Sequence, residues 1–454
     1  MSVLWAPRAW IGGAWAERVL LRIGADGCWA EVTPGAGAPE GAMVLPGPVL
    51  PGLVNAHSHA FQRAFAGLAE RLNPNLGAGD DFWSWRERMY RVALAISPAQ
   101  LRAVAAQLYR ELLRGGYTQV CEFHYLQHRP DGLPYADPLT LSWALADAAA
   151  DAGIGLTLLP VLYERAGFAQ PALRDEQRRF RTDADAVIAL ARGIERAARP
   201  GVRAGVAVHS LRAAAPASIH RLRALAADLD GPVHVHVAEQ TAEVDDCLAA
   251  SGRRPIEWLA TEGLLDARWQ LVHATHALPA EIEAVAASGA GIVICPSTEA
   301  NLGDGVPDLP GWLAAGVPMA IGSDSHMGRD WREELRWLDY AQRLLRRQRN
   351  VAATPLQPAT AARLFEAALG AGGTAAGFAR WGLLPGARAD LLLPDPADPL
   401  GAGLPPAHLL DALVFSGPAR PFLLTLVAGR WVADDDASLC ARARGALQDL
   451  HAAA

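Results

Sequence analysis

Lysine is absent from this sequence of 454 residues, so all 41 of its basic side chains are arginines. Without lysine the chain cannot carry a P-loop lysine, a Schiff-base lysine or a serine–lysine nucleophile pair, and these classes of site are excluded. Against 48 acidic residues the arginines leave a net charge of -7. Because phosphate backbones recruit basic surfaces, this balance argues against nucleic acid as a partner.

Cysteine is scarce, and five scattered residues without a CxxC pair make neither a disulfide framework nor a zinc knuckle. This usage favours a reducing compartment, and we expect a cytoplasmic protein. The N-terminal stretch shows no basic leader followed by a cleavage site, which disfavours secretion. No run of 18 apolar residues occurs, so we expect no membrane span and no membrane partner.

Apolar residues are abundant: 51% of the chain is hydrophobic and 20% is charged, which is enough to bury a large core. Between residues 48 and 386, short apolar runs alternate with Ala/Leu/Arg-rich stretches of helical period. One such stretch, 98–116, ends in the glycine pair typical of a helix C-terminus. Eight apolar runs are expected to be strands: 49–57, 117–123, 155–162, 203–209, 232–238, 269–274, 290–295 and 317–324. Strands alternating with helices in this way predict an α/β fold, a (β/α)8 barrel.

The two ends of the chain follow a different pattern. Residues 1–47 contain short apolar runs broken by glycine and proline, and the segment after 387 contains two similar runs. We expect 1–47 and 387–454 to pair as one small β domain beside a barrel formed by 48–386. A helix is expected at the very end of the chain, with no role that the sequence assigns.

Histidine stands at the ends of three predicted strands, and aspartate stands at the end of a fourth. The ends of barrel strands are where barrel enzymes place their active sites. His57 and His59 are two residues apart on an extended segment, so both imidazoles can hold one metal ion. The fifth strand ends in HVHVAE, where alternation alone allows either His234 or His236 to be a ligand and brings Glu239 close.

The sixth strand ends in His273 and His276, and Asp324 follows the eighth. Singly, each has an ordinary explanation, since a buried histidine is often a hydrogen-bonded core residue and an aspartate often caps a helix. Together, on strands 1, 5, 6 and 8 of one barrel, they favour a metal site. Three imidazoles and a carboxylate suit Zn²⁺ and leave room for a water whose pKa falls to about 7. A further carboxylate can protonate a substrate nitrogen.

These motifs resemble those of the amidohydrolase superfamily, whose pattern runs PG(L/F)xNxHxH, HxxE, a histidine after the sixth strand and SD after the eighth. Here the matching stretches are PGLVNAHSH (51–59), HVAE (236–239), LVHATH (271–276) and GSDS (322–325). The resemblance covers nearly the whole chain, because the family also builds a small β-sandwich from both termini. Its binuclear members commonly carry a carbamylated lysine, so a lysine-free chain is more similar to the mononuclear deaminase branch.

The resemblance implies a role for each motif residue. One zinc ion per subunit would be held by His57, His59, His236 and Asp324. Asp324 would also take the proton of a water, Glu239 would pass it to the substrate nitrogen, and His273 would hold the nucleophile in place. His234 and His276 would then be structural or support these residues. A nitrogen and oxygen ligand set does not by itself distinguish zinc from iron or manganese.

Within that branch the sequence is most similar to the deiminases that act on N-formimino-L-glutamate in histidine breakdown. The similarity lies in 55–70, 80–90, 121–125, 208–213 and 295–305. It implies hydrolysis of a C–N bond in a linear amidine, with release of ammonia and N-formyl-L-glutamate. Two substrate carboxylates call for arginine forks and neutral donors. By the same similarity the substrate would contact Gln62, Arg86, Tyr125, His209 and Arg212.

Several alternatives stay open at this stage. Arg86 fits a solvated helix face, and Tyr125 fits plain packing. A related mononuclear deaminase acting on guanine, cytosine or S-adenosylhomocysteine would want an aromatic clamp and amide donors in place of arginines. A second alternative is a non-catalytic barrel in which zinc only stabilises the fold, and in that case Glu239 would have no function. Relatives are commonly dimers, so the resemblance also implies a homodimer.

Overall fold

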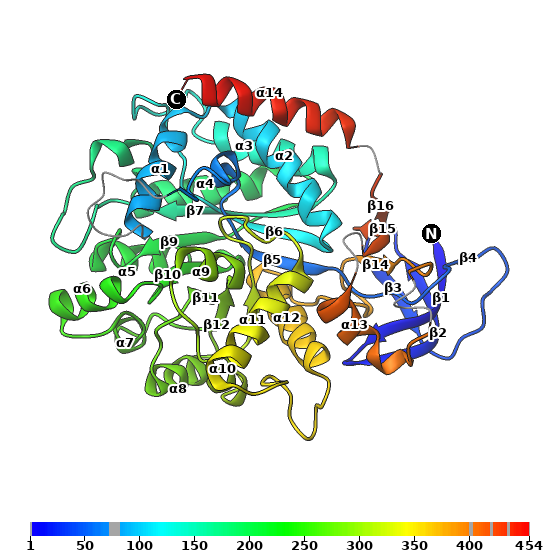
Figure 1. Ribbon diagram of the computed structural model, residues 1–454. Coiled ribbons are helices and arrows are strands. Elements are labelled where there is room, and N and C mark those ends of the chain that lie inside the picture. Colours follow the sequence, from blue (N-terminus) through cyan, green and yellow to red (C-terminus); the bar gives the residue numbers. More distant parts are fainter. Residues whose placement is uncertain (1, 72–81, 399–402, 418–420, 434–435, 454) are drawn as a thin grey trace.

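A parallel barrel forms the centre of the molecule in the computed structural model, which describes residues 2–71, 82–398, 403–417, 421–433 and 436–453 (Figure 1). Neighbouring strands follow one another in chain order: β5 (Leu53–Ser58), β6 (Tyr117–His124), β7 (Gly155–Leu162), β9 (Val206–Ser210), β10 (Val233–Val237), β11 (Trp269–His273), β12 (Gly291–Ile294) and β13 (Met319–Ile321). The backbone N–H of Asp324 donates to the carbonyl oxygen of His57 at 3.0 Å, which joins the last strand to the first. The predicted (β/α)8 barrel is therefore confirmed.

Three of the predicted strands differ in detail from those observed, and the first of them, 49–57, begins only at Leu53 in β5. The run 203–209 is split into β8 (Val202–Ala204) and β9 at Gly205. A Cβ at Gly205 would lie 2.7 Å from the carbonyl oxygen of Pro232, so only glycine allows this close approach. The run 317–324 is a strand only over Met319–Ile321, which leaves Asp324 on the turn that follows.

Helices separate the strands and cover the outside of the barrel (Figure 1). The predicted helix at 98–116 is α2 (Pro98–Arg114), which begins with a Ser97 capping box and ends at Gly115. The other described helices between strands are α1 (Phe82–Ala95), α3 (Thr140–Ala152), α4 (Ala184–Ala197), α5 (Pro216–Leu225), α6 (Thr241–Ser251), α7 (Pro255–Thr261), α8 (Pro279–Ser288), α9 (Pro296–Leu302) and α10 (Leu309–Ala314). After the last strand come α11 (Trp331–Arg346) and α12 (Thr360–Ala375). None of the described helices has the length and apolarity that crossing a bilayer requires.

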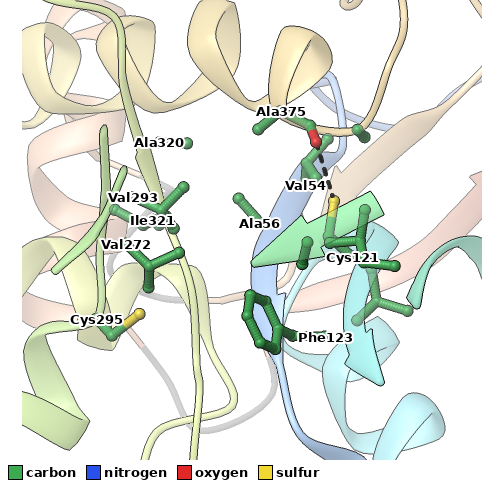
Figure 2. Close-up of a cluster of buried hydrophobic side chains, with 14 of the residues drawn as sticks. Val54, Ala56, Cys121, Phe123, Val272, Val293, Cys295, Ala320, Ile321 and Ala375 are labelled. Carbon is green, nitrogen blue, oxygen red and sulfur yellow. Dashed lines mark hydrogen bonds between the residues drawn. The ribbon is translucent and has the colours of Figure 1, made fainter. Parts of the chain in front are cut away.

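Small apolar side chains fill the inside of the barrel (Figure 2). Val54 and Ala56 of β5, Phe123 of β6, Val272 of β11 and Ile321 of β13 belong to one buried cluster, and each is at most 1% exposed. A filled interior of this kind is a packed core and not a pore. It forms a rigid floor, above which side chains at the carboxyl ends of the strands can be held in place.

Antiparallel strands from both ends of the chain lie together beside the barrel (Figure 1). One sheet contains β1 (Val3–Ile11), β2 (Ala14–Ile23), β3 (Trp29–Thr33) and β4 (Met43–Val44), and the other contains β14 (Leu391–Pro394), β15 (Phe422–Val427) and β16 (Arg430–Trp431). Leu4, Trp29, Leu391 and Leu426 belong to one buried cluster shared by the two sheets. We propose that 1–47 and 387–454 make up this small domain, whose last two helices reach onto the barrel formed by 48–386.

The two helices nearest the C-terminus lie against the barrel. Helix α13 (Leu409–Ser416) packs on α11 and α12, and α14 (Ala437–Ala453) packs along α2. The His451 Nε2 atom of α14 lies 2.8 Å from the carbonyl oxygen of Ala64, in the short helix that follows β5. The terminal helix expected from the sequence is therefore attached to the barrel close to the ends of its strands.

Candidate active site

Three imidazoles and one carboxylate converge where β5, β10 and β13 end. The Nε2 atom of His57 lies 3.1 Å from that of His59 and 3.0 Å from that of His236. The Oδ1 atom of Asp324 lies 3.5 Å from His57 Nε2 and 3.4 Å from His59 Nε2. A tetrahedral ion with bonds of about 2.1 Å separates its ligand atoms by about 3.4 Å. His57, His59 and Asp324 therefore lie close enough to hold one metal ion, and His236 lies beside His57 in a second possible group with His273.

Backbone carbonyls set the tautomers of two of these histidines. The Nδ1 atom of His59 lies 3.0 Å from the carbonyl oxygen of Phe123, and that of His236 lies 2.8 Å from the carbonyl oxygen of His209. Because a carbonyl only accepts, each Nδ1 carries the proton and each Nε2 offers its lone pair to the site. Burial lowers the pKa of both imidazoles and keeps them neutral. The donor set therefore fits a divalent metal ion.

A buried carboxylate supports the segment that carries the first two histidines. Glu122 of β6 accepts hydrogen bonds from the Ser58 hydroxyl and the Ala60 N–H, both at 2.6 Å, and from the Tyr109 hydroxyl at 3.1 Å. Ser58 lies between His57 and His59, so Glu122 fixes the backbone on which both stand. Burial raises the pKa of Glu122 to about 7.

His273 stands between carboxylates at the end of β11. Its Nε2 atom lies 3.7 Å from Glu239 Oε1 and 3.8 Å from Asp324 Oδ2, and its Nδ1 atom lies 3.3 Å from Glu299 Oε1. Burial alone would lower the pKa of His273, but Glu239, Glu299 and Asp324 outweigh it and raise this pKa to about 10. Burial raises the pKa of Glu239. A proton donor and a carboxylate suited to carrying a proton thus stand side by side.

The backbone of several site residues lies in the left-handed region. His273 has φ +69° and Asp324 has φ +47°, and Ala238, which precedes Glu239, has φ +50°. Residues other than glycine rarely adopt this conformation, and such strain gathers at functional sites. Here it occurs where three strand ends turn their side chains toward the same point.

One pocket joins this cluster to the residues that the resemblance assigned to the substrate. Its lining includes His59, His236, Glu239, His273 and Asp324 at one end. It also includes Gln62, Arg86, Tyr125, His209 and Arg212. Both arginines are 6% exposed, and Gln62 Nε2 donates to the Tyr125 hydroxyl at 3.0 Å. Arg86 therefore does not lie on a solvated helix face, and the pocket contains acidic, metal-binding and basic groups within one enclosure.

The two extra histidines lie outside this pocket. His234 shares a face of β10 with His236, but its Nε2 atom lies 2.8 Å from the carbonyl oxygen of Ala375, at the end of α12, so it stands deeper in the barrel than His236. His276 is half-buried and does not line the pocket. The structure therefore selects His236 from the pair that strand alternation left open.

The sequence reasoning gave no role to several residues of this site. Glu299 contacts His273, and Tyr90 and Tyr163 line the pocket beside the arginines. Glu299 and Tyr90 lie within stretches that carried the resemblance, CPSTEANLGDG and DDFWSWRERMY, but nothing in the spacing of either stretch indicates a contact. Tyr163 follows the third barrel strand, and its position at a strand end was an available signal.

Comparisons with known proteins agree with this geometry. The amidohydrolase family model matches residues 49–432. Formimidoylglutamate deiminase of Pseudomonas aeruginosa is 49% identical over 440 residues, which cover 96% of this chain and 95% of the relative. The 5-methylthioadenosine/S-adenosylhomocysteine deaminase of Natronomonas pharaonis is 28% identical over 391 residues, which cover 85% and 81%. The crystal structure of an amidohydrolase from Brucella melitensis is similar with a TM-score of 0.93 and 40% identity, covering 99% of this chain and 100% of the other.

Proposed function

The chain belongs to the amidohydrolase family, and from this premise we propose that it hydrolyses N-formimino-L-glutamate to N-formyl-L-glutamate and ammonia in histidine degradation. One observation carries the proposal: a single pocket places a metal-ligand set at one end and the buried Arg86 and Arg212 at the other. The substrate has the matching layout, with an amidine-like carbon at one end and two carboxylates at the other. The full-length similarity to formimidoylglutamate deiminase supports the same assignment.

The metal end is the part of the pocket in which a bound ion would activate water. A divalent ion held by His57, His59, His236 and Asp324, which we propose to be one zinc per subunit, would lower the pKa of a water and so supply a nucleophile at neutral pH. Asp324 accepts a proton from the attacking water. His273, whose proton the surrounding carboxylates retain, donates to the oxygen of the nucleophile and holds it against the formimino carbon.

Glu239 is placed to protonate the leaving nitrogen. The water oxygen bonds to the formimino carbon, the C–N bond to the terminal nitrogen breaks, and both protons of the water pass to that nitrogen, which leaves as ammonia. Glu239 lies beside His273 and is buried, with a raised pKa, so it can hold a proton and deliver it to this nitrogen. The second nitrogen stays bonded to the glutamate and becomes the amide of the formyl product.

The basic end binds and orients the substrate. Arg86 and Arg212 present planar forks that match carboxylates, in a pocket where burial strengthens charged hydrogen bonds. Gln62, Tyr125 and His209 line the pocket between these arginines and the metal end. We propose that they hold the formimino group and the chain of the substrate so that the reacting carbon faces the metal site.

The protein as a whole is proposed to be a cytoplasmic homodimer that acts on a small acidic substrate and has no nucleic acid or membrane partner. The net charge of -7 and the scarcity of cysteine support this proposal, as does the family resemblance. Gel filtration with light scattering measures the oligomeric state, and a mass near that of one 48.1 kDa chain would contradict the dimer.

Identification of the reaction products tests the proposed reaction. Proton NMR of N-formimino-L-glutamate incubated with the zinc-loaded protein should show the formyl proton of N-formyl-L-glutamate, together with one equivalent of ammonia. Formamide and free L-glutamate would mean that the other C–N bond breaks, which contradicts the role given to Glu239. An unchanged spectrum would contradict the substrate.

A further inference from the structure

Two tyrosines at the arginine end of the pocket share one buried hydrogen-bonding partner. Tyr90 belongs to α1, Tyr163 follows β7, and both line the pocket. Gln177, which is 0% exposed in the short helix Asp175–Phe180, lies behind them. Its Nε2 atom donates to the Tyr163 hydroxyl at 2.8 Å and to the Tyr90 hydroxyl at 3.1 Å.

The orientation of the Gln177 amide is fixed by its other atom. Its Oε1 accepts the backbone N–H of Arg174 at 2.9 Å. A backbone N–H can only donate, so the oxygen must face Arg174 and the NH₂ group must face the tyrosines. Both phenolic oxygens therefore act as acceptors toward Gln177 and keep their own protons.

One of these protons is available to a ligand. The hydroxyl of Tyr163 also hydrogen-bonds with that of Tyr90, which uses one of the two protons within the pair. Among the residues that the structure describes, no acceptor takes the other. Burial raises the pKa of Tyr163, so its phenol stays protonated at neutral pH.

Arginine and tyrosine stand close enough to act on the same group. The guanidinium carbon of Arg86 lies 5.7 Å from the centre of the Tyr90 ring, and the ring of Tyr163 lies 4.4 Å from that of His209. A substrate with two carboxylates brings two negative charges, which Arg86 and Arg212 offset. Each carboxylate offers about four lone-pair sites, and a guanidinium fork fills two of them. Further donors must be neutral, because a third cation would leave an unbalanced buried charge.

We propose that Tyr90 and Tyr163 are specificity-determining residues that donate a neutral hydrogen bond to a substrate carboxylate, and that Gln177 is the positioning residue that turns their hydroxyl groups toward it. This inference rests on the proposed function, because it takes the ligand to be an acidic amidine.

Isosteric variants test the tyrosine pair. Tyr90→Phe and Tyr163→Phe remove one oxygen each. In the more affected of the two variants, KM for N-formimino-L-glutamate should be about tenfold higher than in the wild type, equivalent to about 1.4 kcal/mol. The value of kcat should stay within about twofold. Because the pair offers one proton, the double variant should cost no more than the larger single change. Tyr117→Phe is the matched control, since its buried hydroxyl has no described partner and lies outside the pocket.

Gln177→Glu tests the positioning role. The variant keeps an acceptor for the Arg174 N–H but replaces the NH₂ group by an oxygen, so the phenolic protons turn away from the pocket. KM should rise as in the tyrosine variants, with kcat little changed, and Gln177→Glu combined with the double tyrosine variant should add nothing further. If Gln177 had a purely structural role, the variant would lower Tm and kcat and would not raise KM selectively.

Analogues that each lack one carboxylate, N-formimino-4-aminobutyrate and N-formimino-2-aminobutyrate, give the second readout. For one of them the ratio of variant to wild-type KM should fall to about 1.

Binding of N-formyl-L-glutamate separates this inference from the proposed function. Calorimetry on the zinc-loaded protein should show about tenfold weaker binding in the more affected tyrosine variant than in Tyr117→Phe. If the wild type releases no ammonia yet shows this difference, the proposed function fails and the tyrosine subsite stands. Equal affinities and equal KM values in wild type, both single variants and the double variant would overturn the subsite, whatever the activity.

Discussion

The metal end and the arginine end of the pocket differ in charge and in the elements that carry them. At the metal end the side chains stand at or just after strands β5, β10, β11 and β13, and carboxylates surround them. At the arginine end they come from α1 and from the loops after β7 and β9, and the charged groups are guanidiniums. Strand ends are held rigidly by the packed barrel, whereas loops can change without disturbing it. The comparison indicates that the residues at the strand ends determine the chemistry. The residues of α1 and of the loops after β7 and β9 determine which substrate binds.

The largest effect is expected when one of the proposed metal ligands is removed. His236→Ala should weaken zinc binding by more than about 100-fold, because even residues that merely support a ligand contribute 10- to 100-fold. Activity should be lost with the metal. His234→Ala, two residues away, is the matched control: it loses a bond to the Ala375 carbonyl and should keep both zinc and turnover while Tm falls. Metal analysis and ammonia assays check both variants. Zinc retained in His236→Ala and lost in His234→Ala would reverse the ligand assignment.

The second-largest effect is expected from a substitution that impairs catalysis and leaves metal binding unchanged. Glu239→Gln should lower kcat by about 10²- to 10⁴-fold, the range that general acid–base groups supply, with zinc content unchanged. Glu243→Gln is a fitting control, because Glu243 is buried next to it and accepts the Glu239 N–H at 3.2 Å, which the new amide oxygen can still do. Equal turnover in Glu239→Gln and wild type would favour a structural metal site instead.

The metal end could be predicted from local sequence because its residues stand in short motifs at strand ends. HxH, HxxE and SD each place a side chain in the barrel once the strands are located. Strand alternation did not decide between His234 and His236, because residues two positions apart point to the same face; only the fold shows that His236 lies beside His57 while His234 lies against the Ala375 carbonyl. Glu299 and Glu122 act from other strands and helices, and no spacing in the chain brings them to the histidines.

A third prediction tests the arginine end. Arg212→Ala should raise KM for N-formimino-L-glutamate about 10- to 100-fold, since hydrogen bonds to a charged group contribute about 1.5–3 kcal/mol. Zinc content and kcat should change little. Arg221→Ala serves as the control for charge, because Arg221 pairs with Asp185 on the exposed surface of α5 and is remote from the pocket lining. Steady-state kinetics at fixed ionic strength distinguish the two. An unchanged KM in Arg212→Ala would contradict the assignment of this end to carboxylate binding.

The arginine end was predicted only in part. The resemblance supplied Arg86, Tyr125 and Arg212, but periodicity alone would have left Arg86 on a solvated helix face. Gln177 could not be found at all, because it lies in a short helix between β7 and α4 and reaches Tyr90 only through the tertiary fold. The barrel itself was predictable because eight apolar runs repeat, and the split of one run at Gly205 depends on a close contact with Pro232.

The smallest effect concerns Glu334, a buried carboxyl of α11. Glu334 is buried and accepts the Ser297 N–H at 2.9 Å and the Ser297 hydroxyl at 2.6 Å, and burial raises its pKa to about 8. A carboxyl whose pKa is raised on folding stabilises the fold below its unfolded pKa of about 4.5, and this contribution is lost as pH rises to about 8. Glu334→Gln imitates the protonated form. Its Tm should equal that of the wild type near pH 5 and exceed it by a few degrees at pH 8. A constant difference across this range would contradict the raised pKa.

The most direct test is ammonia release from N-formimino-L-glutamate by the purified protein, measured in the metal-free state and after addition of zinc, with guanine and S-adenosylhomocysteine beside it. The two-ended pocket predicts zinc-dependent release from N-formimino-L-glutamate and little from the two purines. Zinc-dependent release from a purine alone would keep the metal end and contradict the selection attributed to the arginines. Equal release with and without metal would contradict the account of the metal end.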